Sequence, residues 1–192
     1  MKKFFVLCLT GVIMLAALTG CGKQEVDEVQ QDLIQYVETD LAGIKNEEAL
    51  AINRYNEVSA QISSMKRKDI LSAFNDEIIP NYTTFYNNLM NVAPKTAEVI
   101  ALKQTYVDGV KLQLEGLTAL STAIQENNSD NAVAANDTIA QGKAKVDQHR
   151  ADIVALAGEH NINIKTDAGV SANNGGASAD ATEAATETEP AE

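Results

Sequence analysis

Between Glu25 and His160 the apolar residues recur at steps of three and four positions, which is the spacing of one face of an α-helix. This segment contains two prolines and no sustained alternation of apolar and polar residues. A half-buried sheet needs that alternation. The sequence therefore predicts an all-α fold.

The first half of this segment predicts two helical regions. The first stripe runs through residues 26–65, and it fits either one long helix or two helices, because Asn46 could cap a second one. The basic residues 66–68 are expected to end this region, and Asp69 is expected to cap the next helix. Pro80 lies inside that helix and predicts a kink or a break near residues 75–79.

The second half predicts two more helices. Pro94 is expected in the first turn of one helix. Its buried stripe should contain Val99, Tyr106, Val110, Leu117, Leu120 and Ile124. Ser129 or Asp130 is expected to cap the last helix, which should end near residues 158–161. Its seam should contain Val133, Asn136, Ile139, Gly142, Val146, His149, Ile153 and Leu156. Glycines inside helices cost stability, so Gly109, Gly116 and Gly142 are expected where another helix comes close.

Short loops between long amphipathic helices place neighbouring helices antiparallel. We therefore expect residues 25–166 to form an up-down bundle of four helices, or of five if the first region is broken. A coiled-coil dimer is the competing architecture, because several stripes follow steps of three and four. The interruptions at Pro80, Pro94 and residues 127–129 argue against the unbroken heptads that a coiled coil needs.

The N-terminus has the organisation of an export signal. A basic start, Met1–Lys3, precedes a 14-residue apolar run, which is shorter than the ~20 residues of a membrane-spanning helix. The run is followed by Leu18-Thr19-Gly20-Cys21, which resembles the lipobox of bacterial lipoprotein signal peptides. An ordinary secretory signal with a chance cysteine is the competing interpretation.

The lipobox resemblance implies a location and a mature chain. Residues 1–20 would be removed by cleavage between Gly20 and Cys21, Cys21 would carry acyl chains, and residues 21–24 would be a short spacer. Two or three acyl chains attach a protein durably to a membrane. Cys8 would be lost with the signal, so the mature chain could form no internal disulfide. The resemblance thus implies lipid anchoring on the extracytoplasmic face of a bacterial cell membrane.

The charge of the chain limits its partners. It has 15 Lys and Arg against 27 Asp and Glu, a formal net charge of -12. Nucleic acid binding needs a basic face to contact phosphates, and no segment supplies one. Anionic lipid headgroups would also repel such a chain, so its membrane partner is expected to be lipid contacted through Cys21. Residues 167–192 contain no basic residue and few large apolar ones, which predicts a disordered acidic tail.

Few residues could carry chemistry. There is no Gly-rich phosphate loop and no Gly-x-Ser-x-Gly motif, the cysteine Cys21 is used by the anchor, and no carboxylate is marked by an apolar setting. We therefore expect neither catalysis nor a cofactor. His149 is interpreted as a buried, hydrogen-bonded histidine of the bundle. It is the one candidate metal or haem ligand, with Met65 or Met90 as a conceivable partner.

His160 and the aromatic residues around Pro80 are also expected to have structural roles. His160 is expected to interact with the dipole at the end of the last helix. The aromatic residues around Pro80 are interpreted as core, and the competing interpretation is the wall of a small-ligand pocket. These residues are Phe74, Tyr82, Phe85 and Tyr86.

Three segments carry a second resemblance: Glu77–Pro80, Tyr106–Gly109 and Glu159–Ile162. Together they are similar to small all-helical lipoproteins of low-GC Gram-positive bacteria. This resemblance implies a fold and a location but no substrate. The expected function is a non-catalytic binding or scaffolding module with a protein partner in the cell envelope. The alternative is a lipoprotein that binds a small ligand, a metal or haem in the bundle core around His149.

Overall fold

The computed structural model describes residues 27–164, and within that range it contains helices and no strand. The all-α prediction is therefore confirmed for this part of the chain. The predicted signal peptide, the cleavage site at Gly20 and Cys21, and the predicted tail 167–192 lie outside the described residues. A search of the described helices finds none with the length and apolar character needed to cross a membrane.

The first region is one continuous helical rod. It consists of α1 (Glu28–Gln35), a π-helical turn η1 (Tyr36–Leu41), α2 (Ala42–Gln61) and a short 3-10 turn η2 (Ile62–Ser64). The residues that flank η1, Gln35 and Ala42, keep right-handed helical angles, so the chain does not break between α1 and α2. Asn46 lies inside α2 rather than at its start. The choice that the sequence left open is thus resolved in favour of one rod.

The second rod consists of α3 (Arg67–Ser72), the π-helical turn η3 (Ala73–Ile78) and α4 (Ile79–Asn91). The predicted break near residues 75–79 is a π-turn instead. Because η3 changes the hydrogen-bond register, Pro80 falls in the first turn of α4, where its missing N–H costs no helical bond.

The start of the second rod also differs from prediction. Lys66 is the N-cap residue and Arg67 begins α3, so Asp69 lies in the first turn and is not the cap. The basic residues 66–68 therefore open a helix rather than end one. The reason is that the first rod has already ended at η2, after which Met65 is extended.

The third and fourth rods are α5 (Ala97–Glu126) and α6 (Ser129–Glu159). The prediction that Pro94 opens the third rod is wrong, because α5 begins after its N-cap residue Thr96. The oxygen Oδ2 of Asp32 in α1 accepts hydrogen bonds from the backbone N–H groups of Lys95 and Thr96 at 2.8 and 2.7 Å. A carboxylate from α1 thus accepts hydrogen bonds from the N–H groups at the start of α5, and Pro94 lies before this start rather than in the first turn.

The turn between α5 and α6 uses two asparagines. Asn127 ends α5 with a left-handed φ of 55°, and the side chain of Asn128 accepts a hydrogen bond from the N–H of Asn131. Asn128 is therefore the cap that was predicted at Ser129 or Asp130, since the turn ends one residue earlier than expected. The predicted end of the last helix near residues 158–161 is confirmed.

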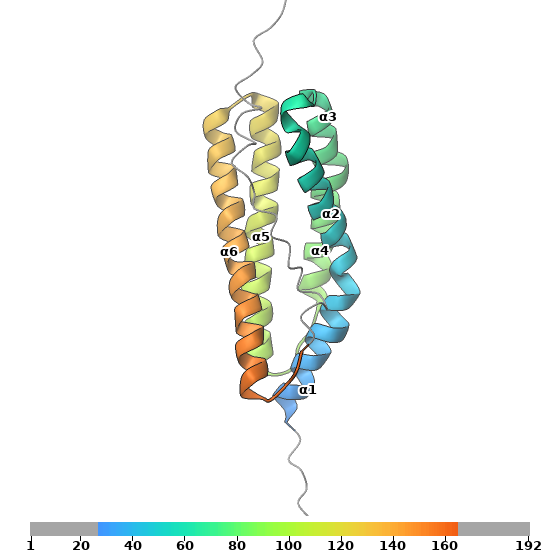
Figure 1. The fold of residues 1–192 in the computed structure, drawn as a ribbon, viewed down its shortest axis with the longest axis vertical. Helices are drawn as coiled ribbons and strands as arrows, with labels where there is room; N and C mark the ends of the chain where they lie inside the picture. The colour runs from blue at the N-terminus through green and yellow to red at the C-terminus, as the bar shows by residue number, and fades with distance from the viewer. Residues whose placement is uncertain (1–26, 165–192) are drawn as a thin grey trace, which may run out of the picture.

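Side-chain contacts place successive rods side by side along the long axis of the molecule (Figure 1). Tyr55 of α2 contacts Phe74 of η3, and Phe85 of α4 contacts Tyr106 of α5, both in edge-on ring contacts near 6 Å. At the other end of the chain, His160 Nδ1 lies 2.6 Å from Asp27 Oδ2. The beginning of α1 and the end of α6 therefore meet at the same end of the molecule.

The helices α5 and α6 approach each other closely. A Cβ atom on Gly142 would lie 2.6 Å from the carbonyl oxygen of Gly109, and one on Gly116 would lie 2.6 Å from Cγ1 of Ile139. Gly109 faces Gly142 while Gly116 faces Ile139, so the two helices are antiparallel. The prediction that these glycines mark close helix contacts is confirmed, and the contact lies within the fold.

The predicted core is largely confirmed. Every residue of the predicted α5 stripe is buried. In the α6 seam Val133 is 46% exposed and Asn136 and Leu156 are partly buried, while Ala132 and Ala135 next to Val133 are buried. Small residues take the core positions there because α5 and α6 are too close for a larger side chain.

Candidate functional site

A pocket of about 240 Å³ lies between α2, α4, α5 and α6. Its apolar wall is formed by Ala51, Ile52, Ile78, Leu117, Ile139 and Val146. The small side chains of Ala51 and Ala140 leave space between α2 and α6, whereas the glycines draw α6 onto α5. The pocket therefore follows from where the small residues lie on these helices.

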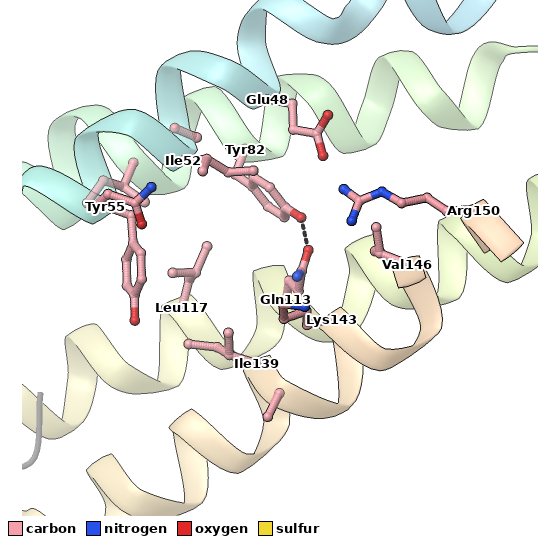
Figure 2. A pocket seen from close by; sticks show the side chains of 14 residues that line it. Glu48, Ile52, Tyr55, Tyr82, Gln113, Leu117, Ile139, Lys143, Val146 and Arg150 are labelled. Atoms are coloured by element: carbon pink, nitrogen blue, oxygen red, sulfur yellow. Dashed lines mark hydrogen bonds between the residues drawn. The ribbon is translucent and has the colours of Figure 1, made fainter. Parts of the chain in front are cut away.

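One end of the pocket is polar and the other is apolar (Figure 2). Glu48, Arg150 and the Tyr82–Gln113 pair gather at one end, and Ile52, Leu117, Ile139 and the Tyr55 ring lie toward the other. This is the usual composition of a small-molecule site, in which an apolar wall supplies area and a few polar groups fix orientation.

Glu48 is the buried acid of the site. It projects from α2 and is only 4% exposed, and the Tyr106 hydroxyl donates a hydrogen bond to its Oε1 at 3.2 Å. Burial raises the pKa of Glu48 to about 7, while the Tyr106 hydrogen bond and the positive charge of Arg150 limit that rise. Near neutral pH the carboxyl can thus change its charge when a neighbour arrives.

Two cations from α6 reach the same region. Asp147 pairs with both, through Lys143 Nζ at 2.6 Å and Arg150 Nη1 at 2.8 Å. Figure 2 shows the Arg150 guanidinium extending toward Glu48 and Tyr82. Asp147 therefore contacts one terminal nitrogen of the Arg150 guanidinium, and the guanidinium has further N–H groups at the pocket.

A neutral hydrogen bond completes the polar end. The Tyr82 hydroxyl of α4 donates to Oε1 of Gln113 on α5. Because this bond uses the amide oxygen, the amide nitrogen of Gln113 remains as a donor on the pocket wall.

His149 lies beside this site rather than in it. It is 1% exposed, stacks on Tyr106 with ring centroids 4.3 Å apart, and is hydrogen-bonded through Nε2 to the Tyr36 hydroxyl at 3.0 Å. Burial, aided by the charge of Arg150, lowers the pKa of His149 to about 3. The interpretation of His149 as a buried, hydrogen-bonded core residue is confirmed, and its stacking fixes the ring that binds Glu48.

The other candidate residues are not brought together. Met90 is 48% exposed, and Met65 follows η2 at the far end of the first rod. His160 follows α6 as expected, but its ring contacts Asp27 at the start of α1. Within residues 27–164, no three His, Cys, Asp or Glu side chains are grouped to hold a metal ion.

The aromatic residues around Pro80 include both core residues and a residue of the pocket wall. Phe74 and Phe85 are buried in the core, whereas Tyr82 is both buried and part of the pocket wall.

The statement that no carboxylate has an apolar setting is wrong for Glu48. Its position did carry a signal, because Leu41, Ile44, Glu48, Ile52 and Tyr55 follow one another at helical spacing. A stripe traced through apolar residues alone passes over an acid at a core position.

The chain matches no protein-family model, no curated protein and no solved structure.

Proposed function

We propose that this chain is a lipid-anchored lipoprotein whose helical domain is a non-catalytic module that binds a small ligand. In this proposal the four rods form an up-down antiparallel bundle, the residues after 166 form an acidic tail, and Cys21 carries the anchor on the extracytoplasmic face of a bacterial membrane. The lipobox residues Leu18–Cys21 support the location.

The observation that carries the binding function is the pocket with a buried acid and a nearby guanidinium. Burying an acid costs folding free energy, and the fold places this acid on a cavity wall, where no neighbouring side chain fills the space. With about 240 Å³ the pocket is smaller than the roughly 300–1,000 Å³ typical of drug-sized ligands. We therefore place the small-ligand role in this pocket and not around His149.

The anchor would set the orientation of the module. Asp27 is the sixth residue after Cys21, and six residues of extended chain span at most about 22 Å. The end of the bundle where Asp27 meets His160 would then face the membrane, and the pocket would lie partway along the bundle.

The binding role is tested by filling the pocket. Ala140 lines it from α6 and is exposed, so Ala140→Phe should occupy the space without disturbing the core. Ala144→Phe is the matched control, because Ala144 is exposed on the same helix and does not line the pocket. The probe is 3-methylbutanamide, a neutral molecule with a branched apolar body.

Binding is measured by calorimetry on the full lipidated protein in nanodiscs, with empty nanodiscs as the blank. We expect the natural chain and the control Ala144→Phe to bind the probe saturably, and Ala140→Phe to bind it at least tenfold more weakly. No saturable binding, or equal binding by all three proteins, would overturn the binding role.

The location is tested separately by Cys21→Ala. The expected result is release of the protein from the membrane or accumulation of the uncleaved precursor. Retention of a processed protein on the membrane would contradict the anchor.

A further inference from the structure

The polar end of the pocket holds two opposite charges that face each other without pairing. Glu48 and Arg150 are close enough for Arg150 to influence the pKa of Glu48. Yet Arg150 forms its ion pair with Asp147. Among the described residues, no nitrogen of Arg150 lies within 4.0 Å of a carboxylate oxygen of Glu48. A gap of this kind between an acid and a guanidinium suits a group that is positive on one side and negative on the other.

The charges around this gap balance. Two acids, Glu48 and Asp147, stand against two cations, Lys143 and Arg150. A ligand with a net charge would leave one of these groups without an opposite charge, which is costly if that group is the buried Glu48. A ligand with no net charge and two separated charges avoids that cost.

The available hydrogen-bonding groups divide in the same way. On the α2 side, the Glu48 carboxylate is an acceptor toward the pocket. On the side of α5 and α6, the guanidinium of Arg150 and the amide nitrogen of Gln113 are donors. An ammonium group fits the first side and a carboxylate fits the second.

The opposite end of the pocket requires an apolar body. Ile52, Leu117 and Ile139 line it, together with the ring of Tyr55. The volume of about 240 Å³ limits this body to a few carbon atoms.

We propose that the pocket binds a small zwitterion with an apolar side chain, which is the chemistry of a free hydrophobic α-amino acid. Its ammonium group pairs with Glu48, its carboxylate accepts hydrogen bonds from Arg150 and Gln113, and its side chain lies against Ile52 and Leu117. This inference rests on the proposed binding function and adds the class of ligand.

The experiment compares L-leucine with two molecules that each lack one charge. 4-Methylpentanoate is leucine without its amino group, and 3-methylbutylamine is leucine without its carboxylate. Each is titrated calorimetrically into the full lipidated protein in nanodiscs. We expect L-leucine to bind at least tenfold more tightly than either of the others, because each hydrogen bond to a charged group contributes a factor of about ten or more.

Two variants test which side chain of the protein pairs with which charge of the ligand. Glu48→Gln should weaken L-leucine and 3-methylbutylamine at least tenfold and leave 4-methylpentanoate unaffected. Arg150→Gln should weaken L-leucine and 4-methylpentanoate and leave the amine unaffected. Lys145→Gln is the control, because Lys145 lies on α6, does not line the pocket and pairs with Asp108. If Arg150→Gln proves unstable in thermal unfolding, Glu48→Gln alone still decides the matter.

Proton release gives an independent readout. An ammonium beside Glu48 favours its charged form, so binding of L-leucine near pH 7 should release protons, as seen from heats in two buffers of different ionisation enthalpy. Glu48→Gln should abolish that release.

The failures are distinguishable. If 3-methylbutanamide binds in the pocket but L-leucine binds no more tightly than the single-charge molecules, the zwitterion is wrong and the binding function stands. If none of the four molecules binds, both are wrong.

Discussion

Glu48 makes the stability of this protein depend on pH in a direction opposite to that of most carboxylates. Its folded pKa of about 7 is above its ordinary value of 4.5, because the side chain is buried. Between these two values the folded chain holds a proton that the unfolded chain has released. The free energy of unfolding should therefore fall as pH rises from about 4.5 to about 7, and Glu48 should add no further change above that.

Glu48→Gln should remove this decline. The amide keeps an oxygen for the Tyr106 hydroxyl but cannot ionise. At about 1.4 kcal/mol per pKa unit, the variant should gain about 3 kcal/mol over the natural chain between pH 4.5 and 8. Urea unfolding at several pH values measures the difference. The other ionisable groups that face Glu48, namely Arg150, Tyr82 and Tyr106, are the same in both proteins.

The control for this prediction is Leu50→Gln, which adds the same amide at an exposed position of α2 outside the pocket and removes no ionisable group. It should leave the pH dependence unchanged. An identical pH dependence in Glu48→Gln and the natural chain would mean that Glu48 is charged in the folded protein throughout this range.

At the scale of single residues, the sequence predicts which side chains are buried better than it predicts which side chains they contact. The helical spacing of the α6 seam correctly indicates that His149 is buried. Its contacts with Tyr36 and Tyr106 join residues that are far apart in the chain, and spacing along one helix contains no information about them. Glu48 was missed because a stripe defined by apolar residues omits a buried acid whose cost is offset by neighbours from other helices.

At the scale of helices, the glycines determine how closely α5 and α6 approach. Gly142→Ala places a methyl group 2.6 Å from the Gly109 carbonyl oxygen and 2.8 Å from the Gln113 nitrogen. Both are backbone atoms, so the helices must separate. We expect a loss of about 1–3 kcal/mol in the free energy of unfolding, measured by urea titration.

Gly43→Ala is the matched control, since it lies inside α2 and a Cβ there has no neighbour within 4 Å. It should stabilise the protein by up to about 1 kcal/mol through helix propensity. If Gly142→Ala is as stable as Gly43→Ala, the close packing of α5 on α6 is not a feature of the folded protein.

Helix ends show why element boundaries are harder to predict than elements. Four helical regions follow from apolar spacing and from the loops near residues 65, 94 and 128, because period and breakers are local properties. The start of α5 depends instead on Asp32, which comes from α1. The π-turns η1 and η3 have no distinctive pattern, except that Pro80 indicates an irregularity close to η3.

At the scale of the whole molecule, the sequence offered a pocket only as an alternative interpretation of the aromatic residues around Pro80, and it did not indicate where the pocket lies. The pocket is lined by the small residues Ala51 and Ala140 on two helices that are not neighbours in the chain, while glycines hold α6 against α5. Each residue has an ordinary role in its own helix. A cavity with one polar and one apolar end arises only when several helices carrying these residues pack together (Figure 2).

The position of a bound ligand tests the central claim most directly. Nuclear Overhauser effects from the methyl groups of 3-methylbutanamide to methyl-labelled full-length protein in nanodiscs would report it. The account predicts contacts with Ile52, Leu117 and Ile139, which line the pocket, and their loss in Ala140→Phe. Contacts confined to exposed methyl groups such as those of Leu50 and Val154, or no contacts at all, would contradict it.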